Sequence, residues 1–161
     1  MSAISESISE ITDFMEKYSL DNGSSHPQFS PDSLSALYAM AYELYRNGKY
    51  EDAKAFFRLL TLVDSFERKY WMGLAGCYQM LKSYNEAIEC YSAAAIQDPS
   101  DPYVHWHAAD CFFYSGDLMK AKEALESALT TAKENEVYDA LIPKLELIFD
   151  TWENLPNGAL S

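Results

Sequence analysis

The sequence has little positive charge, and this shortage excludes whole classes of partner. Its 161 residues carry 12 Lys and Arg against 25 Asp and Glu, which gives a formal net charge of −13 at pH 7. A surface that neutralises nucleic-acid phosphates needs clustered cations, and anionic membranes repel an acidic protein. We therefore expect neither nucleic-acid binding nor direct membrane binding.

Cysteine is scarce, and long apolar runs are missing. No apolar run approaches the length of a membrane span. The first cation is Lys17, and Glu6 and Glu10 precede it, which argues against a secretory signal. There are three cysteines, Cys77, Cys90 and Cys111. Their number is odd, they show no CxxC spacing and they have no histidine cluster beside them, so we expect no disulfide framework and no metal site. These features favour a reducing cytoplasm.

Glycine and proline are few, with six of each, and 48% of the residues are apolar. This composition opposes low-complexity disorder and allows a buried core. The acids concentrate at the ends, because residues 1–33 and residues 134–161 each hold six acids and one Lys, whereas residues 34–133 hold 13 acids and 10 bases. The pattern predicts a central folded array with acidic flanks.

Catalytic motifs are absent from the sequence. It contains no phosphate loop, nucleophile elbow or HExxH pattern. His105 and His107 flank Trp106 and would lie on different faces of a helix, and no pair of carboxylates completes a ligand set around them. We expect a protein that is not an enzyme and that uses no cofactor.

The sequence does contain an internal repeat with a period of 34 residues. Segments that begin at Leu34, Arg68 and Pro102 align without gaps. Their eighth and twentieth positions hold alanine in all three copies: Ala41, Ala75, Ala109, Ala53, Ala87 and Ala121. Small residues at fixed positions let two helices approach closely, while larger apolar residues fill the spaces between them. Each copy therefore predicts a helix, a tight turn and a second helix.

Cap signals help to place the helices. Ser30-Pro31-Asp32 and Asp101-Pro102 are typical of helix starts. We predict an all-α fold whose helices span residues 32–46 and 50–63, 68–81 and 85–97, 102–114 and 118–132, and 136–153. Pro143 either kinks the last helix or marks its restart. That helix would cap the end of the stack.

The domain organisation follows from these elements. Residues 34–135 form three repeats (34–67, 68–101 and 102–135), residues 136–161 form the capping helix and tail, and residues 21–33 form a linker. Residues 1–20 predict an amphipathic helix whose stripe either packs on the chain's own array or on a second copy, giving a homodimer. In the second case the dimerisation residues are Ile4, Ile8, Ile11, Phe14 and Met15.

The first helices of the repeats carry a second apolar side. The packing side of residues 32–46 is already supplied by Leu37, Met40, Ala41 and Leu44, yet Tyr38, Tyr42 and Tyr45 add another stripe. Such a side is either covered by the chain's own flank, such as residues 1–30, or free for a ligand. The predicted peptide-binding groove comprises Tyr38, Tyr42, Tyr45, Met72, Gly76, Met80, Tyr103, Trp106 and Phe113.

The 34-residue period resembles the tetratricopeptide repeat, and the local sequence resembles one family of repeat proteins. The matching stretches are Leu37–Tyr45 with Gly48–Ala53, Met72–Cys77 and His107–Cys111. Together with the acidic charge and the amphipathic N-terminal segment, they are similar to class II chaperones of bacterial type III secretion translocators. The resemblance implies a cytoplasmic chaperone without enzymatic activity that serves a virulence-associated secretion system.

The resemblance also implies a client. Chaperones of this family keep pore-forming translocators soluble and bind an extended N-terminal segment with a Pro-x-Leu-x-x-Pro-like pattern. Other tetratricopeptide repeat proteins clamp a terminal carboxylate with amide and cationic side chains at fixed positions. The matching positions of this sequence hold neither an amide nor a fixed cation, so we do not expect carboxylate clamping. The residues at these positions are Tyr38, Tyr42, Gly73, Tyr103 and His107. The alternative is a generic repeat scaffold or regulatory adaptor that joins two proteins.

Overall fold

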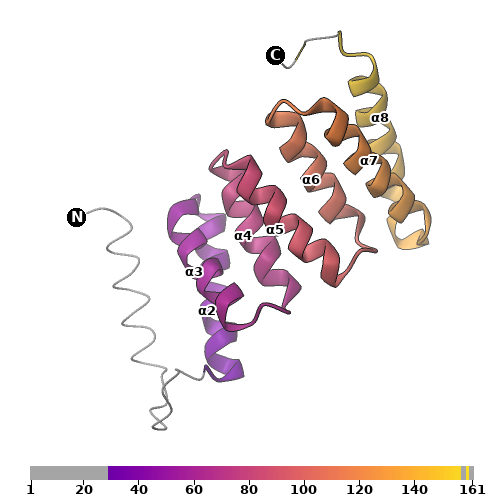
Figure 1. Ribbon diagram of the computed structural model, residues 1–161. Coiled ribbons are helices and arrows are strands. Elements are labelled where there is room, and N and C mark those ends of the chain that lie inside the picture. Colours follow the sequence, from indigo (N-terminus) through magenta and orange to yellow (C-terminus); the bar gives the residue numbers. More distant parts are fainter. Residues whose placement is uncertain (1–28, 157–158, 160–161) are drawn as a thin grey trace. The chain divides into compact units, whose positions relative to one another are not determined.

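The computed structural model describes residues 29–156 and Ala159, and the regular elements within them are all helical (Figure 1). The helices are α2 (Pro31–Arg46), α3 (Tyr50–Val63), α4 (Arg68–Met80), α5 (Tyr84–Gln97), α6 (Pro102–Tyr114), α7 (Leu118–Lys133), the 3-10 helix η1 (Glu136–Leu141) and α8 (Ile142–Glu153). The predicted all-α fold of three helix pairs followed by a C-terminal helix is confirmed. The predicted helix over residues 1–20 and most of the linker lie outside the described residues.

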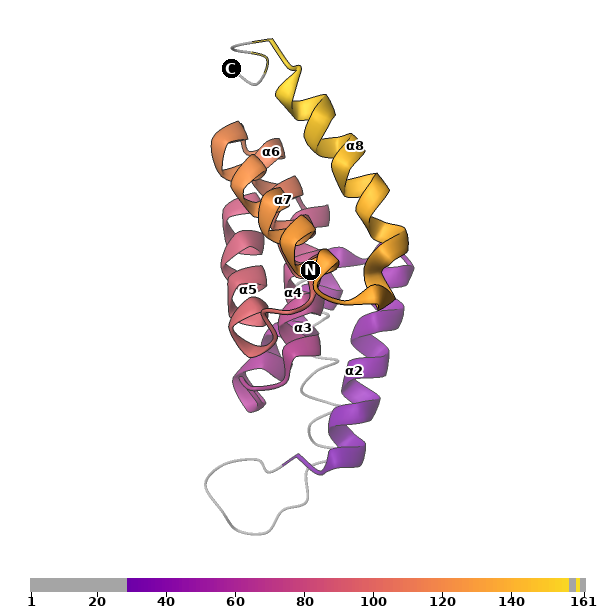
Figure 2. The ribbon, with the colours of Figure 1, turned by 90° about the vertical axis from the view of Figure 1, so that its right-hand side faces the viewer.

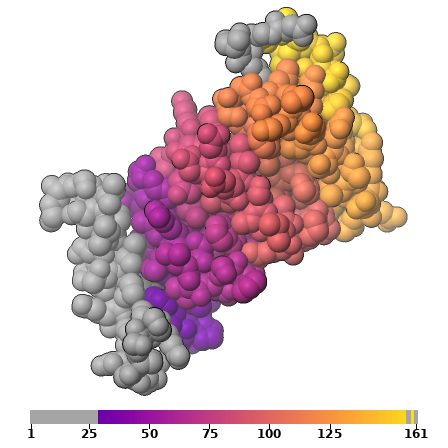
Figure 3. Space-filling model, viewed as in Figure 1, coloured from indigo at the N-terminus to yellow at the C-terminus, as the bar shows by residue number. Residues whose placement is uncertain are grey.

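The chain divides into two compact units between Leu81 and Lys82, at the turn that joins α4 to α5. This division falls inside the predicted repeat 68–101. In the first unit, α3 packs against both α2 and α4. In the second unit, α6 packs against α5 and α7, and α8 lies along α7 (Figures 1 and 2). Side chains fill the spaces between the ribbons of each unit (Figure 3).

The repeated alanines are where the helices of each unit meet. All six alanines at the eighth and twentieth positions are completely buried. In the first unit, Gly73 adds a closer approach, because a Cβ built on it would overlap the ring of Phe57. The small residues therefore set the distance between paired helices, and a larger side chain would push the helices apart.

The turns between paired helices share one backbone conformation. Gly48 and Gly116 have φ angles of 76° and 92°, and Lys82, at the corresponding position of the middle repeat, has a φ of 60°. The left-handed region suits glycine, which has no Cβ, and is unfavourable for lysine. The repeat thus imposes its turn on a residue that does not prefer it.

The fourth position of the repeat fastens each helix to the loop before it. In the second copy, the Trp71 indole N–H donates to the backbone oxygen of Ser65 at 2.8 Å. In the third copy, His105 Nε2 lies 3.0 Å from the backbone oxygen of Pro99. The imidazole replaces the indole at the equivalent position and reaches the equivalent carbonyl. This contact gives His105 a structural role.

The C-terminal segment restarts at a proline, as one of the two sequence-based alternatives proposed. η1 ends at Leu141, and Pro143 occupies the first turn of α8, where its missing N–H costs no hydrogen bond. α8 buries Leu145 and Trp152 in a core that it shares with α6 and α7. The helix therefore covers apolar surface that α7 would otherwise expose, as expected of a cap.

Candidate functional site

Two of the three tyrosines of α2 stack on each other in the first unit. The rings of Tyr38 and Tyr42 stack with their centroids 6.2 Å apart, and Tyr42 keeps 49% of its surface exposed. Beneath them, Leu37 and Ala41 are completely buried. The helix is thus apolar on two sides, as predicted, and its second side presents aromatic surface to solvent at Tyr42.

Tyr38 is the most connected of these tyrosines. Its ring lies 5.9 Å from the Phe57 ring in an edge arrangement and 5.9 Å from the Tyr70 ring. Lys69 places its Nζ 4.9 Å from the Tyr38 ring centroid, which is the geometry of a cation–π contact. Contacts from α3 and α4 on two sides therefore hold the Tyr38 ring in place.

Tyr45 is partly buried at the other end of the stripe. A Cβ built on Gly76 would lie 3.3 Å from Tyr45 Cε2, and the Tyr45 ring meets Tyr50 edge-on at 5.3 Å. The sequence-based interpretation was that Gly76 leaves room for a ligand's backbone. The structure shows that the chain's own Tyr45 ring lies against Gly76.

Burial raises the pKa of both Tyr38 and Tyr45 above the usual tyrosine value. In each case the loss of solvent is the main cause. Both phenols therefore stay protonated over the physiological pH range. A protonated phenol can both donate a hydrogen bond to a peptide carbonyl and accept one from a peptide N–H.

The two methionines of the predicted groove lie on α4, in the first unit. Met72 is half-buried, and Met80 is exposed near the end of the helix. Methionine side chains adapt their shape to an apolar partner. Met40 was expected on the packing side of α2 but is 40% exposed. We define the α2–α4 face as Tyr38, Tyr42, Tyr45, Met72 and Met80.

The second unit holds the other three predicted groove residues, and each contacts the C-terminal segment. Tyr103 meets Tyr138 of η1 edge-on at 6.1 Å. Lys144 places its Nζ 4.6 Å from the Trp106 ring centroid. Phe113 stacks on Trp152 with the centroids 4.7 Å apart. The sequence analysis considered residues 1–30 as a cover for this surface, whereas the structure shows residues 136–153 in contact with these side chains.

Asp110 lies on the same helix, between Trp106 and Phe113. Burial raises the pKa of its carboxyl to about 6, while the nearby positive charge of Lys144 acts in the opposite direction. With a pKa of about 6, the charge of this half-buried carboxyl depends on pH near neutrality.

Contacts made by four residues of these surfaces could not be read from the sequence. The contact of Lys69 with Tyr38 depends on where α4 packs. Tyr70 occupies the third repeat position, which the repeat pattern does not mark as a contact. Lys144 and Trp152 come from the C-terminal segment, whose pairing with α6 leaves no local sequence signal.

The cysteines and histidines show no sign of chemistry in the described part of the chain. Burial raises the pKa of Cys90 to about 11 and that of Cys111 to about 12, so the protonated thiol is favoured at neutral pH. His107 stacks on Tyr91, and burial lowers its pKa. Among the described residues, no group of three or more His, Cys, Asp or Glu could hold a metal ion.

No helix within the described residues combines the length and the apolar character needed to cross a membrane.

Comparisons with known proteins agree with the repeat architecture. The family described as "Tetratricopeptide repeat" matches residues 38–102. Low calcium response locus protein H of Yersinia pestis is 38% identical over 98 residues, which cover 61% of this chain and 58% of the relative. Chaperone protein SicA of Salmonella typhimurium is 32% identical over 95 residues, which cover 59% of this chain and 58% of the relative. The aligned part thus spans less than two thirds of these curated relatives.

Solved structures match over a larger share. PcrH, crystallised with the chaperone binding region of PopD, has 32% identity and a TM-score of 0.74, covering 78% of this chain and 94% of that chain. SycD of Yersinia enterocolitica, crystallised with a peptide of the translocator YopD, has 31% identity and a TM-score of 0.72, covering 77% and 95%. The fold is that of a helical repeat protein. The chain belongs to the family of type III secretion translocator chaperones with tetratricopeptide repeats.

Proposed function

We propose that this protein is a cytoplasmic chaperone of a bacterial type III secretion system, and that it binds an extended apolar segment near the N-terminus of a translocator. Binding keeps the translocator soluble and competent for secretion. The protein acts without enzymatic activity and without a cofactor, as a homodimer. Family membership supports this assignment, since PcrH and SycD have been crystallised with segments of PopD and YopD.

The observation that carries the proposal is the aromatic surface at Tyr42. The Tyr42 ring is half-exposed and stacks on the partly buried ring of Tyr38. It belongs to a helix that already buries Leu37 and Ala41 in the core. Exposed aromatic rings on a rigid support offer contact area at little entropic cost. On the α2–α4 face, Met72 and Met80 supply adjustable apolar contacts, and the tyrosine hydroxyls can hydrogen-bond to the backbone of an extended peptide.

The strength of binding is expected to be moderate. A short peptide that covers a few hundred Å2 of apolar surface, at about 25 cal/mol per Å2, gains several kcal/mol before the entropic costs of association. A dissociation constant in the micromolar range is consistent with that balance. Such affinity holds the translocator before secretion and still permits its release.

The test is fluorescence anisotropy of a labelled Pro-x-Leu-x-x-Pro peptide titrated with the full chain. We expect saturable binding, no binding of an acidic C-terminal peptide, and at least tenfold weaker binding by Tyr42→Ala, because the loss of a central aromatic anchor costs about 1.4 kcal/mol or more. Phe66→Ala is the matched control, since Phe66 is 88% exposed in the loop after α3 and lies off the α2–α4 face. Unchanged affinity in a folded Tyr42→Ala variant would favour the scaffold or adaptor alternative.

A further inference from the structure

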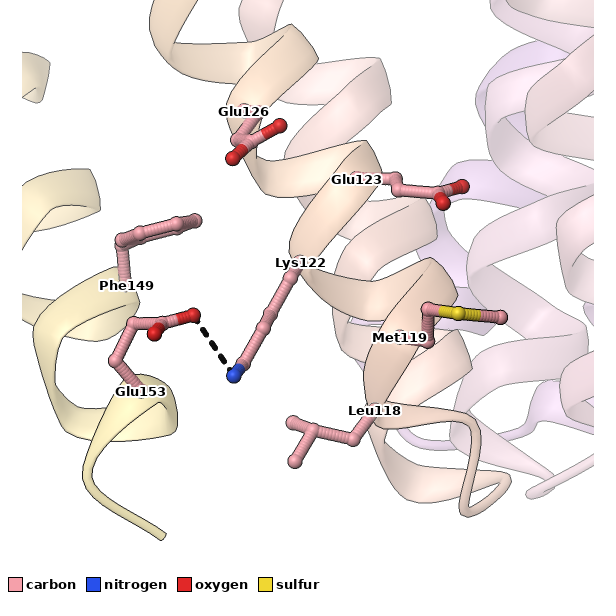
Figure 4. A pocket seen from close by; sticks show the side chains of 7 residues that line it. All are labelled: Leu118, Met119, Lys122, Glu123, Glu126, Phe149 and Glu153. Carbon is pink, nitrogen blue, oxygen red and sulfur yellow. Dashed lines mark ion pairs between the residues drawn. The ribbon is translucent and has the colours of Figure 1, made fainter.

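A second surface of the protein has the form of a docking site, and it lies within the second unit. A hollow of about 380 Å3 opens between the beginning of α7 and the end of α8. In Figure 4, Leu118 and Lys122 of α7 and Phe149 and Glu153 of α8 point toward the gap between the two helices. Met119 also lines the hollow, although its side chain points away from α8, and 69% of its surface is exposed. The floor and one edge of the hollow are therefore apolar.

The rim of this hollow is acidic. Lys122 Nζ lies 2.8 Å from Glu153 Oε1, so the one cation of the lining is already neutralised by a carboxylate of α8. Glu123 and Glu126 complete the lining, and within residues 29–156 no cation forms an ion pair with either of them. Two carboxylates one helical turn apart thus border an apolar floor with their charge uncompensated.

The same two glutamates also border a neighbouring hollow on the opposite side of α7. This hollow has a volume of about 440 Å3 and is lined in addition by His105, Ser127, Thr130 and Thr131. Glu123 and Glu126 therefore form a ridge between an apolar depression and a polar one. A ligand that lies across the ridge can place different side chains on its two sides.

We propose that the hollow between α7 and α8 is a second docking site, which binds a basic amphipathic segment of another protein. An apolar side chain of that segment lies on Leu118 and Phe149, and its Lys or Arg side chains reach Glu123 and Glu126. A hollow of this size takes one or two side chains of a short segment and leaves a folded domain outside. The acidic rim selects a cationic partner and repels an acidic one.

Charge also disfavours three other occupants of the hollow: a second copy of the chain, its own N-terminal segment and anionic lipid headgroups. A second copy of this chain would bring a surface with 25 acids and 12 bases to an acidic rim. The chain's own first 33 residues carry six acids and one Lys, so they are a poor match as well. Anionic lipid headgroups would meet the same repulsion. A basic segment from a different protein is the occupant that the charges favour.

This inference does not depend on the proposed translocator site, because the α2–α4 face belongs to the first unit. Its test uses the full chain and a labelled helical peptide made of Leu, Ala and Arg, with a matched peptide in which Glu replaces Arg. We expect saturable binding of the basic peptide that weakens as salt is raised, and no binding of the acidic peptide.

Protein variants then locate the site. Glu123→Gln combined with Glu126→Gln should weaken the basic peptide about fivefold, since two rim charge pairs are lost. The matched control is Glu86→Gln combined with Glu89→Gln, which removes two exposed carboxylates with the same spacing from α5 and should change the affinity less than about twofold. Met119→Ser should weaken binding without changing its salt dependence, and Ile96→Ser, which alters an exposed apolar residue of α5, should not weaken it.

Four results would overturn the proposal. Equal weakening by the two glutamine pairs would show diffuse attraction to an acidic protein. Equal binding of the basic and the acidic peptide would point to an uncharged partner. A lower sedimentation coefficient of the Met119→Ser variant than of the wild-type protein, both without peptide, would point to a second copy as the occupant. A loss of Pro-x-Leu-x-x-Pro peptide binding in the Glu123→Gln, Glu126→Gln variant would show that the hollow is not a separate site.

Discussion

Lys82 is a single residue on which the repeat imposes an unfavourable backbone. Its φ of 60° lies in the left-handed region, where the two equivalent turns have glycine. The steric cost of that conformation for a residue with a Cβ exceeds the entropy that glycine loses on folding. The middle turn is therefore a site at which the sequence departs from its own pattern at the expense of stability.

We expect Lys82→Gly to raise the free energy of unfolding by about 0.5–1 kcal/mol. Urea denaturation followed by circular dichroism measures this difference. Lys49→Gly serves as the control, because Lys49 has an ordinary φ of −85° and its replacement gains nothing. A stabilisation of equal size in both variants would contradict the conformational explanation.

Asp110 gives the second unit a pH dependence. Because burial raises its folded-state pKa to about 6, the folded state takes up a proton from Asp110 at a higher pH than the unfolded state does. Its contribution to stability is thus favourable at low pH and falls as the pH rises through about 6. A permanently neutral side chain would not show this loss.

Asp110→Asn is accordingly expected to stabilise the protein at pH 7 relative to its effect at pH 4.5, by about 1 kcal/mol after allowance for solvent screening. The measurement is the difference in Tm between variant and wild type across this pH range. A difference that is constant with pH would show that Asp110 does not titrate there.

At the scale of elements, a large side chain near the end of α8 helps to hold this helix to the second unit. Trp152 stacks on Phe113 and is buried in the core formed with α7. Removing the indole would leave a cavity at the junction of α6, α7 and α8. The C-terminal helix then loses its anchor at the end that borders the α7–α8 hollow.

We expect Trp152→Ala to lower the free energy of unfolding by about 3–5 kcal/mol. Leu147→Ala, on the same helix but at a residue that is 67% exposed, should change it by less than about 0.5 kcal/mol. Chemical denaturation of both variants makes the comparison. Similar effects at the two positions would indicate that α8 contributes through its helicity alone.

The helices could be predicted from the sequence because their signals are local. Repeated alanines at Ala41 and Ala75, the cap at Ser30 and the proline at Pro143 each act within a few residues, and the structure confirms the elements they predict. The period of 34 residues added the pairing of helices, since equivalent positions must make equivalent contacts.

The surfaces were harder to predict, because they depend on contacts between distant segments. The stripe of Tyr38 and Tyr42 was visible from its spacing, but the cover that the C-terminal segment provides for Trp106 and Phe113 was not. The side chains that make this cover lie about thirty to forty residues away, and no periodicity links them to α6. Packing of an additional helix on the last repeat decides which side chains stay accessible.

At the scale of the whole molecule, charge and the N-terminal segment govern self-association. A net charge of −13 opposes the approach of two copies, so a dimer needs an apolar contact that outweighs the repulsion. The predicted stripe of Ile4, Ile8 and Ile11 is such a contact, and it lies outside the described residues. We therefore propose that this stripe joins the two copies of the homodimer.

We expect the full chain to behave as a dimer in sedimentation velocity and the chain without residues 1–20 to behave as a monomer. Ile8→Asp combined with Ile11→Asp should have the same effect. Ser5→Asp combined with Ser9→Asp adds the same charge off the predicted stripe and should leave the dimer intact. A dimer that persists without residues 1–20 would place the contact in the repeats.

The burial of all three cysteines has a practical consequence. Cys77 belongs to the first unit and Cys90 and Cys111 belong to the second, and the structure keeps each side chain away from solvent. A thiol reagent can reach them only when the surrounding helices separate. The rate of thiol modification therefore reports the opening of each unit separately, without any engineered probe, and a bound peptide that slows the reaction at Cys77 alone would reveal which unit holds it.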